Sequence, residues 1–150
     1  MKIATLAEAF GKGLFAGAAG TAVMTVSSTL EMKIRGRKPS SAPATAASKV
    51  LGAEPTGEKE KKRFSNAVHW GYGTAWGAAR GALGAVGLSG PVASAAHFAA
   101  VWGSEQVMLP SLGVAPPFWT WGTKEVAIDA FHHAVYVAAT SVAYELLDRG

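Results

Sequence analysis

The segment formed by residues 124–136, KEVAIDAFHHAVY, sets two carboxylates, two adjacent histidines and a tyrosine among apolar side chains. Glu125, Asp129 and His133 follow one another at intervals of four residues, so on a helix they lie along one face. Carboxylate and imidazole groups together suit Zn, Fe or Mn, and imidazole also titrates near neutral pH. The segment therefore predicts a metal site or a proton-binding site. The alternative is that one buried acid and one histidine form a purely structural pair.

Helical periodicity extends this candidate site to other parts of the chain. In residues 122–146, one arc of about 100° contains the polar side chains; they are Glu125, Asp129, His132, His133, Tyr136 and Thr140. On neighbouring helices, His69 and Glu105 are expected at the same depth as Asp129, about 7 to 10 Å into the membrane core from the cytoplasmic side. The predicted metal or proton site therefore comprises His69, Glu105, Glu125, Asp129, His132 and His133.

The segments that carry these residues are predicted to be membrane helices. Hydrophobic residues make up 49% of the chain and charged residues only 16%, against about 25% charged in typical soluble domains. A membrane helix needs about 20 mainly apolar residues, and four segments qualify, near residues 11–32, 64–88, 91–110 and 122–146. We expect an all-α, four-helix transmembrane bundle that forms one domain over residues 1–150. A soluble, alanine-rich helical bundle is the alternative.

Small residues on these segments predict close helix packing. Gly73, Gly77 and Gly81 repeat every four residues, a spacing that lets helix backbones approach closely in a membrane. Arg80 and His97 are expected about 20 Å from the cytoplasmic surface, as a polar pair nearer the outer face.

The loop at residues 33–63 holds nine of the fourteen Lys and Arg residues. The positive-inside rule therefore predicts a cytoplasmic loop, with both termini and the connection at residues 88–91 outside. Within this loop, residues 44–51 are expected to form a short helix that begins after Ser40 or Ser41 and ends at Gly52. Nucleic acid is not an expected partner because aromatic residues do not alternate with the basic ones.

Several kinds of chemistry find no support in the sequence. The chain has no cysteine, which excludes disulfides, thiolate metal sites and cysteine nucleophiles. No nucleophile elbow, P-loop or dinucleotide fingerprint appears, and we expect no enzymatic activity. Haem or chlorophyll ligation by His97 or His133 is disfavoured, because two histidines at unequal depth do not form a bis-histidine pair. The sequence leaves the cofactor unknown, with a divalent metal as the candidate.

Four stretches resemble the YagU-like small inner-membrane proteins of bacteria. They are AGAAGTAVM leading to EMKIRGRKPS, then HWGYGTAWGAARG, LPSLGVAPPF and EVAIDAFHH. The most specific part is the proline-rich loop followed by the helix with acids and histidines; it maps to Pro110, Gly113, Pro116, Pro117, Glu125, Asp129 and His133. The resemblance implies a multi-spanning protein of the bacterial cytoplasmic membrane, from a family of largely unknown function for which a link to acid stress is proposed.

Together these features predict a small four-span membrane protein whose buried acid and histidine cluster serves a proton- or metal-linked function. The alternative is an accessory or structural subunit whose glycine-rich faces dock onto a larger membrane complex, possibly in contact with its cofactor. Besides the lipid bilayer, the expected partners are such a complex or further copies of the chain.

Overall fold

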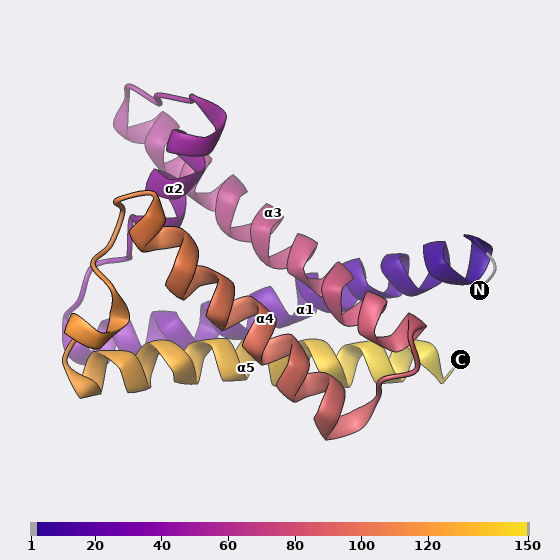
Figure 1. The fold of residues 1–150 in the computed structure, drawn as a ribbon. Helices are drawn as coiled ribbons and strands as arrows, with labels where there is room; N and C mark the ends of the chain where they lie inside the picture. The colour runs from indigo at the N-terminus through magenta and orange to yellow at the C-terminus, as the bar shows by residue number, and fades with distance from the viewer. Residues whose placement is uncertain (1–2, 150) are drawn as a thin grey trace.

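The computed structural model describes residues 3–149, which form five α-helices, one short 3-10 helix and no strand (Figure 1). The helices are α1 (Ile3–Arg35), α2 (Ala42–Leu51), α3 (Glu58–Ala85), α4 (Gly90–Ser111) and α5 (Thr123–Asp148), with η1 (Phe118–Thr120) between the last two. The all-helical prediction is confirmed for these residues, and the four segments predicted as spans lie largely within α1, α3, α4 and α5.

Helices α1 and α5 run antiparallel, side by side (Figure 1), and an ion pair joins them near each end of α5. Lys12 Nζ lies 3.0 Å from Asp148 Oδ1, and Arg35 Nη1 donates to Glu125 Oε2 at 3.1 Å. Positions 12 and 35 on α1, like 125 and 148 on α5, are 23 residues apart, which corresponds to about 34 Å of helix. The two ion pairs therefore fix the register of α1 against α5.

Helix α3 contacts α1 through glycine, as its four-residue repeat predicts. A Cβ atom added to Gly77 would lie only 2.5 Å from the Cα of Gly17, and one added to Gly13 would lie 2.5 Å from the carbonyl oxygen of Gly77. Real side chains do not approach a backbone so closely, so this contact requires glycine on both helices.

The loop between α1 and α3 contains the expected short helix. Helix α2 begins at Ala42 and ends at Leu51, and the next residue, Gly52, adopts a left-handed φ of 64°. Such a conformation favours glycine after a helix C-terminus. The Ser41 side chain does not cap the helix. Lys49 Nζ donates to the carbonyl oxygen of Leu112 at 2.6 Å, so α2 is attached to the end of α4.

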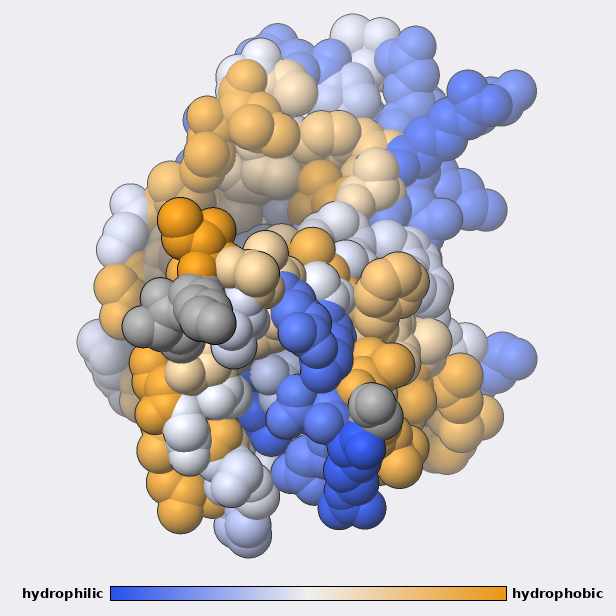
Figure 2. Space-filling view, turned by 90° about the vertical axis from the view of Figure 1, so that its right-hand side faces the viewer, coloured by the Kyte–Doolittle hydropathy of each residue, from blue (hydrophilic) through white to orange (hydrophobic). Residues whose placement is uncertain are grey.

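Two helices, α1 and α5, are long and apolar enough to cross a membrane by length and composition, and 28% of the residues in the most apolar window of each are buried. Many large apolar side chains are instead exposed, including Phe15, Val26 and Phe131. The exposed area of the described chain is 8878 Å², whereas a soluble monomer of 15.4 kDa typically exposes about 7,200 Å². Figure 2 shows hydrophobic residues on both flanks and hydrophilic residues at the centre of the end where the termini lie.

The prediction of four spans is supported for only two helices by the same criterion of hydropathy. Helix α3 begins with the charged sequence EKEKKR, and α4 contains the polar residues His97, Glu105 and Gln106. These polar residues count against both helices by this criterion.

Candidate metal or proton site

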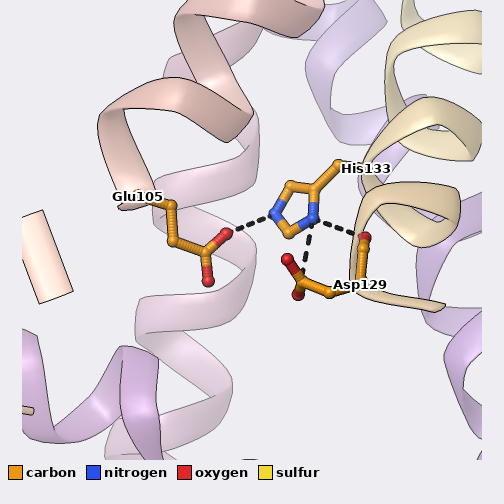
Figure 3. Close-up of side chains that lie close together, drawn as sticks. All are labelled: Glu105, Asp129 and His133. Atoms are coloured by element: carbon orange, nitrogen blue, oxygen red, sulfur yellow. Dashed lines mark hydrogen bonds and ion pairs between the residues drawn. The ribbon is translucent and has the colours of Figure 1, made fainter. Parts of the chain in front are cut away.

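The structure brings Glu105, Asp129 and His133 together between α4 and α5 (Figure 3). One ligand atom from each residue lies within 4.8 Å of the other two. His133 Nε2 is 2.8 Å from Glu105 Oε2, and the side chains of the three residues retain only 13% to 26% of their full exposure. The cluster is therefore partly shielded from solvent and offers three metal-ligating groups.

The surroundings of His133 determine which of its nitrogens carries a proton. Nδ1 lies 2.9 Å from the backbone carbonyl oxygen of Asp129, and a carbonyl can only accept, so Nδ1 donates. Nε2 then faces Glu105 with either a lone pair or a second proton. A backbone carbonyl that binds the distal nitrogen of a histidine is the common arrangement behind metal ligands.

His133 and Glu105 form a short contact. Nε2 of His133 lies 2.8 Å from Glu105 Oε2, an ion pair when the imidazole is protonated, and Glu105 Oε2 is buried. The same two atoms could bind one metal ion, because two ligand atoms about 2.1 Å from an ion are at most about 4.2 Å apart.

Trp102 orients the carboxylate of Asp129. Its Nε1 donates to Asp129 Oδ2 at 2.8 Å, and its ring stacks on Phe98 with centroids 5.6 Å apart. Because Oδ2 is held by the indole, Oδ1 remains available as a ligand atom. The indole is thus a hydrogen-bonding neighbour that fixes one ligand in place.

His132 belongs to a different network, although it is adjacent to His133. Its Nδ1 lies 2.9 Å from Ser27 Oγ, and its Nε2 lies 3.9 Å from Glu31 Oε2, so it faces α1. Neighbouring residues on a helix point about 100° apart, which is the full width of the predicted polar arc. The two histidines therefore fall on its opposite edges and face different helices.

The remaining predicted ligands lie outside the cluster. His69 Nε2 lies 2.8 Å from Thr25 Oγ1, between α3 and α1. Glu125, in the first turn of α5, pairs with Arg35 at the end of α1. Only three of the six residues predicted for the site are therefore brought together.

Arg80 and His97 are both fully buried, at 1% and 0% exposure, but they have separate partners. Arg80 Nε donates to Ser141 Oγ at 3.3 Å, and its guanidinium lies over the Tyr144 ring, 4.5 Å from the centroid. His97 Nε2 donates to the carbonyl oxygen of Trp76 at 3.0 Å. Within the described chain the two residues form no direct hydrogen bond.

Two residues that contact the predicted site residues, Trp102 and Glu31, were not predicted from the sequence. Trp102 lies three residues before Glu105, so helical spacing could have placed it on the same side of α4. Glu31 gave no such signal, because it lies near the end of the segment predicted to span residues 11–32, outside the predicted cluster. Its carboxylate binds both Arg35 and Arg37.

Comparison with known proteins adds no assignment: no family model matches the chain, and neither a curated protein nor a solved structure matches it. The chemistry of the site therefore rests on the side chains and distances described above.

Proposed function

We propose that this chain is an integral protein of the bacterial cytoplasmic membrane whose Glu105, Asp129 and His133 bind a divalent transition-metal ion. The carrying observation is the approach of three ligand atoms from two helices to within 4.8 Å of one another. A hydrogen-bonded tautomer of His133 and an indole-bound Asp129 support the assignment, because metal ligands are usually held by such neighbours.

Membrane insertion is supported by α1 and α5. Their apolar faces are exposed, and the ion pairs at their ends are about 34 Å apart, close to the hydrocarbon thickness of about 30 Å. Helices α1, α3, α4 and α5 alternate in direction (Figure 1), as four consecutive spans would. The resemblance to YagU-like proteins supports the bacterial cytoplasmic membrane, and the basic loop would face the cytoplasm.

The ligand set suits Zn, Mn or Fe(II), which accept both imidazole and carboxylate. Two ligand atoms about 2.1 Å from one ion are at most about 4.2 Å apart, so binding needs only a small closing of the cluster. Three protein ligands leave a coordination position open for water or an exchanging group. This is the pattern of a reactive or exchanging site rather than of a purely structural one.

Metal analysis of the protein purified in mild detergent tests the proposal directly. We expect one equivalent of metal in the wild type after incubation with Zn²⁺ or Mn²⁺, and its loss in the double variant Asp129→Asn, His133→Ala. The control is His69→Ala, which removes a histidine that binds Thr25 instead and should leave the metal content unchanged.

Two results would reject metal binding: no bound metal in the wild type, or equal metal in wild type and double variant. The cluster would then be read as a protonated His133 paired with Glu105, a proton-linked site. Membrane insertion has its own test, since an integral protein stays with membranes after extraction at high pH and a soluble one does not.

A second candidate, an accessory subunit of a larger complex, is favoured by one observation. Ala95, Ala99 and Gly103 lie four residues apart on α4, and no neighbouring atom lies within 4 Å of the Cβ position of Gly103. Gly73, Gly77 and Gly81 of α3 cannot serve as the docking face expected earlier, because α1 covers them. Co-purification of an equimolar partner, lost in Gly103→Leu, would support this candidate.

A further inference from the structure

Three aromatic rings meet beside the candidate metal site, and one of them comes from the loop between α4 and α5. Trp102 stacks on Phe98, which lies four residues earlier on α4, with ring centroids 5.6 Å apart. From the loop, the ring of Phe118 in η1 packs against the same indole, with centroids 5.9 Å apart and planes tilted by 56°. Both distances lie in the range of favourable aromatic pairs. The Trp102 ring is therefore held by its own helix and by the loop that follows this helix.

The indole of Trp102 connects this aromatic contact to a ligand on another helix. Its Nε1 atom donates to Asp129 Oδ2 at 2.8 Å, and Asp129 lies on α5, beyond the loop. A tryptophan side chain has only two rotatable bonds, so the contacts of its ring determine where Nε1 points. Among the aromatic contacts of Trp102 within residues 3–149, only that with Phe118 comes from outside α4.

Hydrogen bonds inside the loop fix the position of Phe118. Two prolines precede it, and the proline ring restricts φ, which is −57° at Pro117. The carbonyl oxygen of Pro117 accepts from the Thr120 hydroxyl at 2.7 Å and from the Thr120 backbone N–H at 2.9 Å. The carbonyl oxygen of Pro116 accepts from Trp121 Nε1 at 2.8 Å. The loop is thus preorganised around the Phe118 ring.

A contact with α2 holds the beginning of the same loop. Lys49 Nζ donates to the carbonyl oxygen of Leu112 at 2.6 Å and lies 3.4 Å from that of Gly113. The loop is therefore restrained at its start by α2 and near its end by its own turn, and neither restraint involves a residue of the metal cluster.

We propose that Phe118 is a positioning residue of the candidate metal site: it holds the Trp102 indole so that Nε1 keeps the Asp129 carboxylate in place for the ion. The inference rests on the metal binding proposed above. Phe118 has no group that ligates a metal, so it acts through Trp102. The loop between α4 and α5 thereby sets the affinity of a site that is built from the two helices it joins.

Calorimetric titration with Zn²⁺ of the detergent-purified protein tests this role in four proteins. They are the wild type, Phe118→Ala, Trp102→Phe and the variant with both substitutions. We expect Phe118→Ala to lower the metal affinity by about two- to tenfold, as for the loss of one aromatic pair. In Trp102→Phe the hydrogen bond to Asp129 is already absent, so adding Phe118→Ala should change the affinity no further. Such non-additivity identifies a residue that acts through another.

Two further variants serve as controls for the titration. Phe118→Tyr keeps the aromatic ring and should bind metal as the wild type does. Phe131→Ala removes an equal ring from α5, where Phe131 is 58% exposed and packs against His132 instead of the cluster. This variant should also keep the wild-type affinity.

A second readout follows the hydrogen bond without any metal. In nitrogen–proton NMR spectra each of the five tryptophans gives one indole N–H resonance, and that of Trp102 is the one missing from Trp102→Phe. We expect this resonance to move in metal-free Phe118→Ala and to exchange faster with solvent, but to stay in place in Phe131→Ala. A general loss of stability would not move this single resonance.

The outcomes separate this inference from the proposed function. Equal affinities of the wild type and Phe118→Ala would overturn the positioning role and leave the metal site intact. An equal loss in the wild-type and Trp102→Phe backgrounds would overturn it as well, because Phe118 would then act independently of the indole. A wild type that binds no metal contradicts the proposed function, and an unmoved Trp102 resonance contradicts the positioning role even then.

Discussion

His133 Nε2 on α5 lies 2.8 Å from Glu105 Oε2 on α4, and this contact sets how the candidate site should respond to pH. A metal needs the lone pair of Nε2 and ionised carboxylates, so protons compete with it. We expect metal affinity to fall as the pH falls, by about tenfold per pH unit for each proton displaced. Calorimetric titrations in buffers of different ionisation enthalpy measure both the affinity and the protons released. A pH-independent affinity would contradict ligation by His133.

Trp102 should tune the site without binding the ion. Trp102→Phe keeps the aromatic contact with Phe98 but removes the hydrogen bond to Asp129. Loss of such a supporting interaction typically lowers metal affinity by about 10- to 100-fold. Trp70→Phe is the matched control, because Trp70 is half-exposed on α3 and lies outside the cluster. Equal affinities for the two variants would show that the indole does not orient the ligand.

The contact between α1 and α3 should tolerate no side chain at Gly77. A Cβ atom there would lie 2.6 Å from the nitrogen of Gly17, so Gly77→Ala must push the helices apart, at a cost of about 1 to 3 kcal/mol. Gly71→Ala on the same helix meets nothing within 4 Å and should stabilise the helix by up to about 1 kcal/mol. Unfolding of both variants in mixed micelles measures the difference. Similar stabilities would mean that α1 and α3 are not packed this closely.

Helix α3 should cross the membrane even though its mean hydropathy is low. The cysteine-free chain allows single cysteines to be placed at Ser40 and Ser89, which are exposed in the segments that precede and follow α3. We expect a membrane-impermeant maleimide to label Ser89→Cys in intact cells and Ser40→Cys only after permeabilisation. The unsubstituted protein gives the background. Labelling of both positions from one side would show that α3 does not cross.

The sequence predicted the helices better than the site. Runs of apolar and small residues predicted all four long helices, and Gly52 predicted the end of α2, because these signals are local. Which residues come together as ligands depends on the rotation and tilt of each helix relative to its neighbours, and no short stretch of sequence determines these. A rotation of about 100° between adjacent residues decides that His133 meets α4 while His132 meets α1. The partners of Glu125 and Glu31 likewise depend on the register of α1 against α5, which the pattern of one helix does not contain.

Helix α4 packs less extensively than the other long helices, because α3 and α5 each form a large contact with α1. It supplies Glu105, whereas Asp129 and His133 belong to α5, whose ends are fixed to α1 by ion pairs. A bound ion would therefore link α4, which makes few contacts, to α5, which is held against α1. Metal binding should then slow the exchange of the amide hydrogens of α4 with solvent, while the exchange of those of α1 stays unchanged.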